Sequence, residues 1–532
     1  MRSHSTYMPL AAGLVVAQAA SPLYKSPVDI AGLGKVQGVA ALNSSVADYI
    51  DNWADISFFG GIPFGASTAG ANRFAPPRPA APWNTTLDAS TFGPICPTSN
   101  QQISTYPMSE DCLSINIWTP ATSADEKLPV AFWSYGDGTA APQTQFNGGG
   151  VAGKGAVFVT YNYRNGVLGF LADPNLPEVT GSNATGNWGV LDQYLAVKWV
   201  HDNIAAFGGD PDHITVMGQS FGSAATYHIV NSNLTTGLGI VGAISESGVR
   251  SPNDVMSSEI ALSYSTLDEA LEIGAAALAD LNVTTVDEAR ALSYETILAS
   301  TGTEDQEIKP VLDHYAIPDK YIVSIRDGAA NKVPYITGNN ADEYGVSNTF
   351  TTTTDDYISY VEGNFGNLNA TFLAVYPADN DTQASTSQIA LVRDQSTVSS
   401  WQAMDGFSNS SGATTYTYYW NYAPPNDGSA SHGSEIPYAL GNLWAQAGVN
   451  YTSEDYYIAN VLSSYWANFI KTSDPNSGDS YNNGTLPAIW KPNSGVDKTT
   501  FKVGAAYENI DVAGSDAKIQ AFLEWFALTP AI

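Results

Sequence analysis

The stretch VMGQSFGSAA, residues 216–225, decides the fold of this chain. Its pattern Gly218-x-Ser220-x-Gly222 is typical of a sharp turn that joins a strand to a helix and lifts a serine clear of the backbone. A serine in that position can act as a nucleophile. With 47 glycines in 532 residues, however, such a pattern can also arise by chance, so the surrounding residues have to decide.

Apolar runs on both sides of Ser220 predict a mostly parallel sheet of the α/β class. Runs typical of buried strands occur at residues 128–134, 156–164, 213–218, 239–245 and 333–338. Apolar residues from Val190 to Phe207 have the spacing of a largely buried helix. Strands that alternate with helices predict a sheet covered on both faces, with ligands beyond the carboxyl ends of its strands. Ser220 lies at such an end.

The bulk composition indicates a large globular protein that is secreted. The chain has 44% hydrophobic residues and a net charge of -31, which disfavours nucleic acid and anionic membranes as partners. Residues 1–19 are expected to form a signal peptide, since an apolar run follows Arg2 and ends in Ala17-Gln18-Ala19. A short buried helix is the alternative. No later apolar stretch is long enough to span a bilayer, and no linker divides residues 20–532, which predicts a single domain.

Glycosylation sequons and two cysteines agree with an extracellular location. Several glycans are expected on the ten sequons, which are Asn43, Asn84, Asn183, Asn233, Asn282, Asn369, Asn380, Asn409, Asn450 and Asn483. Cys96 and Cys112 are expected to form one disulfide, with two buried free thiols as the alternative. A metal site would need more cysteines or clustered histidines, so neither a metal nor another cofactor is predicted.

A nucleophilic serine needs a histidine as base and a carboxylate to orient it, in the chain order serine, acid, histidine for this kind of sheet. Of the six histidines, His432 alone follows Ser220 at a suitable distance in a loop rich in glycine and serine. The imidazole must be neutral to accept a proton, which predicts loss of activity below a pKa near about 6.5, or lower if the site is buried. Asp342 and Glu343 both follow the strand 333–338, and the residues alone do not choose between them.

The chain resembles the type-B carboxylesterase/lipase family, which includes the cholinesterases. The resemblance rests on GNWGVLDQYLAVKWVHDNIAAFGGDPDHITVMGQSFG (186–222), SEDCLSINIW (109–118), NYRNGVLGFL (162–171), GNNADEYG (338–345), HGSEIPYALGN (432–442) and YWANFIKTSDPN (465–476). It implies one α/β-hydrolase domain and a secreted, fungal-like member of the family.

The same resemblance assigns expected roles to individual residues. It implies Ser220 as nucleophile, Glu343 as acid and His432 as base. Ser247 and Glu435 match positions that support the site from behind. Cys96 and Cys112 match the disulfide that closes a loop ahead of the segment EDCL.

Two positions depart from the family pattern. Gln219 stands where members usually have glutamate, which removes a negative charge and argues against a cationic, choline-type substrate. The glycine run of the family's oxyanion hole is replaced by WSYGDGTA, so the backbone donors would be Asp137, Gly138 and Phe221. The Asp137 carboxylate would raise the energy of a nearby oxyanion unless it turns away or is protonated.

These observations predict a serine carboxylic-ester hydrolase that works through an acyl-enzyme on short to medium acyl esters. The segment PTSNQQISTYPMSED between the cysteines is short and mostly polar, with only Ile103, Tyr106 and Met108 as sizeable apolar side chains. A lid for lipid surfaces would need a broader apolar face. The alternatives are an interfacial triacylglycerol lipase or sterol esterase, and an inactive cholinesterase-like binding protein.

Overall fold

The computed structural model describes residues 21–176, 185–258, 262–300, 308–425, 427–481 and 484–531. The expected signal peptide lies outside the described residues, and so do Asn183 and Asn483 of two sequons.

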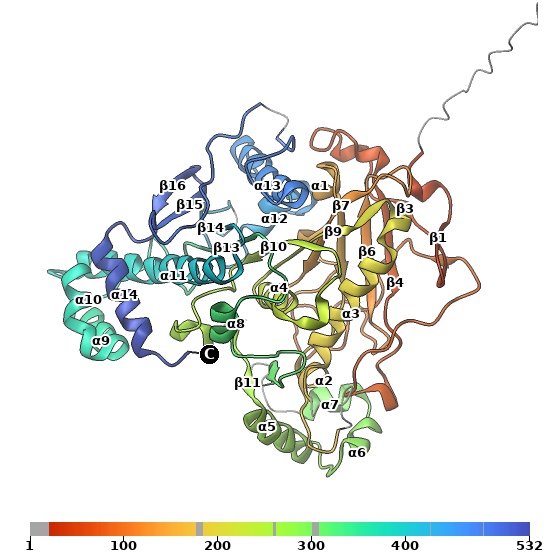
Figure 1. The fold of residues 1–532 in the computed structure, drawn as a ribbon, viewed down its shortest axis with the longest axis horizontal. Helices are drawn as coiled ribbons and strands as arrows, with labels where there is room; N and C mark the ends of the chain where they lie inside the picture. The colour runs from red at the N-terminus through yellow and green to blue at the C-terminus, as the bar shows by residue number, and fades with distance from the viewer. Residues whose placement is uncertain are drawn as a thin grey trace, which may run out of the picture.

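Within the described residues, eleven strands form one central sheet in the order β16-β15-β14-β13-β10-β9-β7-β8-β6-β4-β3 (Figure 1). Their bounds are β3 (Val39–Ala40), β4 (Ser57–Pro63), β6 (Ser114–Thr119), β7 (Leu128–Ser134), β8 (Val157–Tyr161), β9 (Gly209–Gln219), β10 (Ile240–Glu246), β13 (Tyr335–Asn340), β14 (Thr415–Asn421), β15 (Thr499–Gly504) and β16 (Glu508–Asp511). Neighbours from β8 to β15 pair in parallel, and the pairs at both edges are antiparallel. The predicted mostly parallel sheet is confirmed.

Two small sheets and the helices surround the central sheet. One small sheet holds β1 (Val28–Ile30), β2 (Gly34–Gln37) and β5 (Leu87–Asp88), and the other holds β11 (Ser265–Thr266) and β12 (Val311–Leu312). The helices are α1 (Gly149–Gly153), α2 (Gly166–Phe170), α3 (Trp188–Asn203), α4 (Phe221–Asn231), α5 (Leu267–Asp280), α6 (Val286–Arg290), α7 (Tyr294–Ser300), α8 (Tyr321–Asp327), α9 (Thr354–Phe365), α10 (Asn369–Val375), α11 (Asp381–Ser411), α12 (Ile436–Ala439), α13 (Ser453–Thr472) and α14 (Asp516–Leu528).

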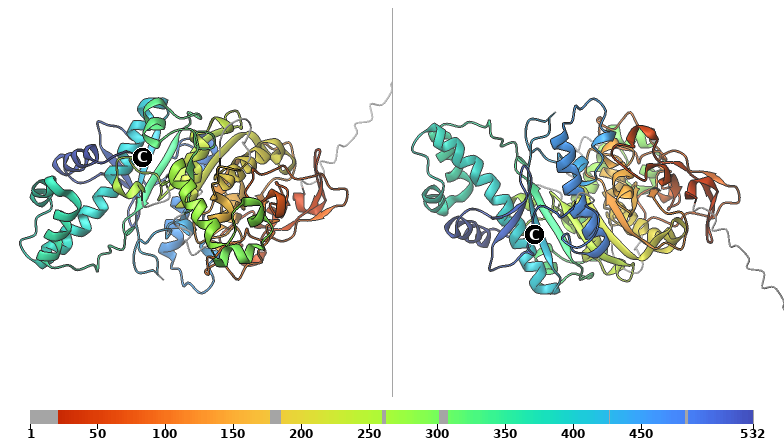
Figure 2. Two further views of the ribbon diagram at one scale, coloured as in Figure 1. Left: turned by 90° about the horizontal axis from the view of Figure 1, so that it is seen from below. Right: turned by 90° about the horizontal axis from the view of Figure 1, so that it is seen from above.

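Helices cover both faces of the sheet, as the apolar strands require. Helices α3, α4 and α11 pack on one face, and α1 and α13 pack on the other (Figure 2). The predicted helix 190–207 is α3, which continues as a 3-10 turn over Ile204–Phe207. It ends at Gly208, whose φ of 79° is in the left-handed region that favours glycine.

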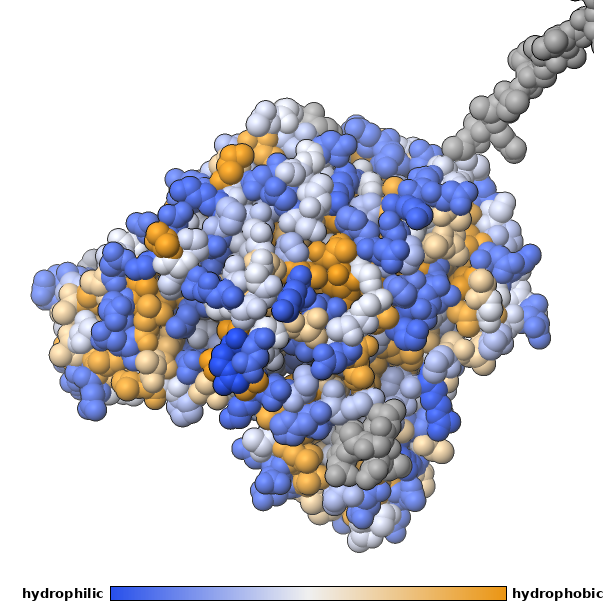
Figure 3. Space-filling view, viewed as in Figure 1, coloured by the Kyte–Doolittle hydropathy of each residue, from blue (hydrophilic) through white to orange (hydrophobic). Residues whose placement is uncertain are grey.

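A helical lobe at one end of the molecule has a hydrophobic core of its own. In this lobe α9, α10 and α14 pack beside α11, and the rings of Phe365, Phe372 and Trp525 lie in contact (Figure 1). Figure 3 shows hydrophobic residues over this lobe and in separate patches elsewhere on the same face, between hydrophilic residues. Most of the lobe is inserted between β13 and β14.

The turn at Ser220 depends on the two glycines of the quoted pattern. A Cβ atom at Gly222 would lie 1.9 Å from the carbonyl oxygen of Ser134, and one at Gly218 would lie 2.4 Å from the carbonyl oxygen of Gly222. Both distances are far below van der Waals contact, so the first turn of α4 reaches β7 this closely only without side chains. Ser220 itself has a φ of 59°, which is uncommon for a residue other than glycine.

We predict that Gly222→Ala destabilises the protein by about 1–3 kcal/mol or more, because the added methyl group meets a strand carbonyl that has no room to move. Gly363→Ala is the matched control, since nothing lies within 4 Å of its Cβ position in α9. The control should gain up to about 1 kcal/mol of stability. Thermal unfolding of both variants checks this, and equal midpoints for the two would contradict it.

Candidate active site

Ser220 stands between the end of β9 and the start of α4, at the carboxyl edge of the sheet. Its N–H donates to the carbonyl of Glu246 at 2.9 Å, and its own carbonyl accepts from the N–H groups of Ser223 and Ala224. These bonds fix the backbone, while the side chain remains partly exposed. The sequence prediction that the serine lies beyond a strand end is met.

His432 and Glu343 lie on loops that follow the neighbouring parallel strands β14 and β13. Nδ1 of His432 is 2.5 Å from Oε2 of Glu343, and the other carboxylate oxygen accepts from the N–H of Asn340 at 2.8 Å. Nε2 of His432 lies 3.1 Å from the side-chain nitrogen of Gln219, the residue before Ser220. Among the described residues, this amide and not the Ser220 hydroxyl is the hydrogen-bond partner of Nε2.

Asp342, the other acid that the sequence left open, has a different position. Its carboxylate pairs with the guanidinium of Arg393 and accepts from the N–H of Ala430 at 2.9 Å. Its N–H donates to the carbonyl of Ala430 at 3.0 Å. Asp342 therefore ties the loop that carries His432 to the end of β13. Arg393 was missed by sequence reasoning, because its position in the middle of α11 gives no local signal.

Two further buried carboxylates, Glu435 and Glu246, lie behind His432 and Glu343. Glu435 accepts from the amide of Asn340 and lies 3.5 Å from the Ser247 hydroxyl. Burial, together with the charge of Glu343, raises the pKa of Glu435 to about 7.

Glu246 lies at the carboxyl end of β10 and accepts from the indole N–H of Trp466 at 2.7 Å. Burial and the charge of Glu435 raise its pKa above the usual range. Glu246 and Trp466 were not predicted, although Glu246 stands directly before Ser247 in the sequence.

The turn after β7 passes directly beside Ser220. A Cβ atom at Gly136 would lie 3.0 Å from Cβ of Ser220, so the backbone of Asp137 and Gly138 begins next to the serine. Gly138 has a φ of 69°. The side chain of Asp137 is exposed. Phe221, the first residue of α4, stacks on Tyr163 with ring centroids 6.2 Å apart.

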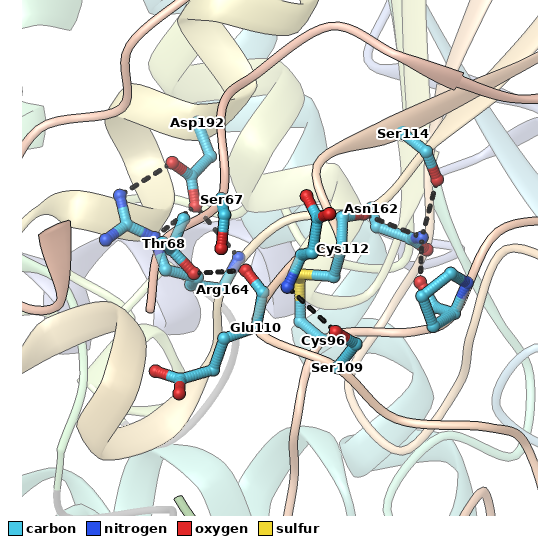
Figure 4. The surroundings of a disulfide bond; sticks show 12 residues. Ser67, Thr68, Cys96, Ser109, Glu110, Cys112, Ser114, Asn162, Arg164 and Asp192 are labelled. Carbon is cyan, nitrogen blue, oxygen red and sulfur yellow. Dashed lines mark hydrogen bonds and ion pairs between the residues drawn. A yellow bond between two sulfur atoms is a disulfide. The ribbon is translucent and has the colours of Figure 1, made fainter. Parts of the chain in front are cut away.

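Cys96 and Cys112 form the expected disulfide (Figure 4). The amide of Asn162 donates to the carbonyl of Cys112 at 3.1 Å and so holds the end of the loop. Within the loop, Ile103 is buried and packs with Tyr106, Met108 and their neighbours in a small core of their own that includes Ala140. The apolar side chains of the loop thus pack inward, against the segment that follows Asp137 and Gly138.

The charges around His432 set its protonation. Burial alone would lower its pKa, but the carboxylate of Glu343, its hydrogen bond to Nδ1 and the charge of Glu435 outweigh burial and raise the pKa above the usual value. The sequence expectation of an ordinary or lowered pKa is therefore wrong in direction. Burial alone would raise the pKa of Glu343. The charge of His432 and the hydrogen bonds from His432, Asn340 and Ser247 outweigh burial, and they hold this pKa below the usual value.

Comparison with known proteins decides the family. A sequence model described as the carboxylesterase family matches residues 26–520. The chain belongs to the carboxylesterase family. It is 32% identical to fumonisin B1 esterase of Sphingopyxis macrogoltabida over 80% of each chain. It is 31% identical to para-nitrobenzyl esterase of Bacillus subtilis, over 78% of this chain and 86% of the relative, and 31% identical to bile salt-activated lipase of Bos taurus, over 86% and 80%.

Solved structures of carboxylesterases share the fold. A structure of PNB esterase superimposes with a TM-score of 0.74 at 26% identity and covers 93% of this chain and 99% of its own. Carboxylesterase EST55 of Geobacillus stearothermophilus gives 0.74 at 26% identity, with 94% and 99% covered.

The family establishes the reaction class. The carboxylesterase has the α/β-hydrolase fold and is a carboxylic ester hydrolase, as the sequence predicted. The relatives named here are bacterial and mammalian, so they do not support the expectation of a fungal-like member. No helix in the described part of the carboxylesterase is long and apolar enough to cross a membrane.

We predict that Glu343→Gln lowers the pKa of His432, because the substitution removes the largest charge that stabilises the imidazolium and leaves only the charge of Glu435 to oppose burial. Titration of the imidazole by NMR measures this, with His432→Asn used to assign the signal. Glu524→Gln, at an exposed position of α14, should leave the pKa unchanged. A pKa that stays the same or rises in Glu343→Gln would contradict the assigned pairing.

Proposed function

We propose that this carboxylesterase hydrolyses its ester substrates through an acyl-enzyme formed on Ser220, with His432 as general base and Glu343 as the acid that orients it. The observation that carries the proposal is the Glu343–His432 pair, whose Nε2 lies 3.1 Å from the side chain of Gln219, the residue next to Ser220. A serine raised on a strained turn beside an imidazole and carboxylate is the arrangement that nucleophilic acyl transfer requires.

In the first half of the reaction, Nε2 of His432 takes the proton of the Ser220 hydroxyl as Oγ attacks the ester carbonyl. Negative charge on the carbonyl oxygen is held by the N–H groups of Asp137, Gly138 and Phe221. The tetrahedral intermediate collapses, the bond to the alkoxy oxygen breaks, and the alcohol leaves with the proton from His432. In the second half, water attacks the acyl-enzyme and passes a proton to His432. The bond to Oγ then breaks, His432 returns the proton to Oγ, and the carboxylic acid leaves with Ser220 restored.

For this cycle to begin, His432 exchanges its contact with Gln219 for one with Ser220. Both contacts use the same lone pair on Nε2, so they exclude each other. The amide nitrogen of Gln219 can donate to a neutral imidazole, and its amide oxygen can accept from an imidazolium. The contact with Gln219 is therefore open to both forms of His432, and the raised pKa means that His432 must lose a proton before it can act as the base. Glu435 and Ser247 act indirectly by fixing Asn340 and the carboxylate of Glu343.

Short to medium acyl esters are the proposed substrates. The apolar side chains of the disulfide loop pack inward on Ala140, which leaves the loop little apolar area to present to an oil surface. Similarity to a bile salt-activated lipase supports the alternative of a triacylglycerol lipase or sterol esterase.

We also propose that the carboxylesterase is secreted and glycosylated. The expected signal peptide, the disulfide and the acidic surface suit an extracellular protein. Of the eight sequon asparagines in the described residues, all except Asn369 have exposed side chains, which leaves room for a glycan.

Ser220→Ala should lower kcat by several orders of magnitude, because no other group can form the acyl-enzyme. An organophosphate should label Ser220 and abolish activity, as mass spectrometry and ester hydrolysis measure. Ser223→Ala, three residues further along, is the control that retains activity. An active Ser220→Ala enzyme would reject the mechanism, and inactivity of the wild type on all esters would favour the binding-protein alternative.

Asp137→Gly should raise the turnover of simple esters about tenfold, which corresponds to about 1.4 kcal/mol of barrier, because the variant removes a negative charge from a residue whose N–H is a proposed oxyanion donor. Asp137→Asn removes the charge without adding the backbone flexibility of a glycine, and we expect it to raise the turnover as well. Steady-state kinetics of both variants with one nitrophenyl ester provide the measurement. A collapse of activity would mean that Asp137 assists the reaction.

Rates on nitrophenyl esters of increasing acyl length should peak between acetate and hexanoate. They should show no jump when the substrate passes its solubility limit, because the disulfide loop lacks an outward apolar face. Sharp activation on an emulsified long-chain triglyceride would assign the enzyme to the lipases instead.

A further inference from the structure

Arg250 is a buried arginine that the proposed reaction cycle does not use. It stands four positions after Glu246, the last residue of β10, and it is 1% exposed. Its Nε donates to the carboxylate of Asp254 at 2.8 Å, and its Nη1 donates to the hydroxyl groups of Tyr344 at 2.9 Å and Ser396 at 3.1 Å. A buried ion pair is often no more stabilising than apolar residues of the same size, so stability alone does not explain an arginine at this position.

Tyr344, one of the partners of Arg250, is the residue directly after Glu343. The guanidinium of Arg250 also lies over the ring of Tyr344, 5.2 Å from the ring centroid, where a cation and an aromatic face attract each other. Arg250 therefore holds both the hydroxyl and the ring of Tyr344. Because Glu343 and Tyr344 are neighbours in one turn, these contacts fix the backbone that carries the Glu343 carboxylate.

The residue on the other side of Glu343 is held by a second arginine. Asp342 pairs with Arg393, whose Nε also donates to the carbonyl of Ala341 at 3.2 Å. One guanidinium thus holds the residue before Glu343, and another holds the residue after it.

Helix α11, which packs on β13 and β14, supports both arginines (Figure 1). Arg393 is part of this helix, and Ser396 of the same helix accepts from Arg250. Gln395 donates to the second carboxylate oxygen of Asp254 at 2.7 Å, so the helix also fixes the ion-pair partner of Arg250. Arg250 is therefore held in place by an element of the main fold.

Arg250 is also one of the charges that surround Glu343. Burial alone would lower the pKa of Arg250, but the charge of Asp254, the hydrogen bond to Asp254 and the charge of Glu343 outweigh burial and raise it. The attraction between two opposite charges acts on both of them, so Arg250 in turn favours the ionised form of Glu343. The charge of Glu435 acts on Glu343 in the opposite direction.

We propose that Arg250 is a positioning residue for the acid of this site, which holds Tyr344 and so directs the carboxylate of Glu343 toward Nδ1 of His432. The inference rests on the proposed function, in which Glu343 orients His432. Arg250 acts through Tyr344 and Glu343 and not on the substrate.

Tyr344→Phe removes the hydroxyl that accepts from Arg250 and keeps the ring. We expect kcat to fall about tenfold at an unchanged KM, because a hydrogen bond from a charged donor is lost and Glu343 acts on the chemical step. The pKa of His432, titrated by NMR, should also fall, since a loosely held Glu343 stabilises the imidazolium less. A smaller fraction of folded enzyme would lower kcat without moving this pKa. Tyr457→Phe, at an exposed tyrosine of α13, is the matched control and should change neither value.

Arg250→Gln combined with Asp254→Asn tests the arginine itself. Because both charges are removed together, no unpaired charge remains in the interior, and thermal unfolding should show a folded protein. We expect kcat and the imidazole pKa to fall as in Tyr344→Phe. Arg290→Gln combined with Asp287→Asn removes an ion pair of α6 and should leave both values unchanged.

A double-mutant cycle separates this inference from the proposed function. In a Glu343→Gln background, Tyr344→Phe should lower kcat by less than about twofold, because the group through which it acts is already gone. If the two losses multiply, or if Tyr344→Phe keeps the kcat and imidazole pKa of the wild type, the role of Arg250 is overturned and the proposed function stands. If Glu343→Gln itself keeps the wild-type kcat, Glu343 is not the acid, and the proposed function and the role of Arg250 are both rejected.

Discussion

The close approach of the first turn of α4 to β7 is the contact on which the rest of the site depends. Only glycine at position 222 lets the helix start against the carbonyl of Ser134. Because α4 starts this close to β7, Gly136 lies beside Ser220. Gly136 begins the turn that supplies the proposed oxyanion donors. Nucleophile and donors are thus set by one backbone packing arrangement, before any side chain contributes.

The second constraint is electrostatic. Glu343 and Glu435 lie buried near the imidazole of His432, and the buried Glu246 interacts with Glu435; like charges this close in a low-dielectric interior cannot all ionise. His432 keeps Glu343 ionised, whereas burial and repulsion make the other two acids retain their protons more readily. The donors from Asn340 and Trp466 hold these side chains in place. The carboxylates behave as a coupled group in which each protonation state depends on the others.

Strand positions could be predicted because continuous apolar runs report burial directly, and β7 begins and ends at the predicted residues 128 and 134. Periodicity likewise located α3. The choice between Glu343 and Asp342 could not come from local sequence. The two acids are adjacent in one loop, and they differ in the direction in which the folded loop points each side chain. Arg393 and Trp466 reach the site through tertiary packing from distant helices, which no sequence spacing records. The contact between Gln219 and His432 depends on side-chain placement across 213 positions of sequence.

The insertion of most of the helical lobe between β13 and β14 has a consequence for how this protein can change. Glu343 and His432 are 89 positions apart, yet pairing of the two strands and the bridge between Asp342 and Ser431 keep them adjacent. For a flexible connection, each doubling of loop length costs only about 0.6 kcal/mol in closure entropy. The stretch between β13 and α11, which holds α9 and α10, can therefore lengthen, shrink or be exchanged while α11 keeps Arg393 on Asp342 and the acid and base stay in register, so that new surfaces can evolve beside an unaltered reaction centre.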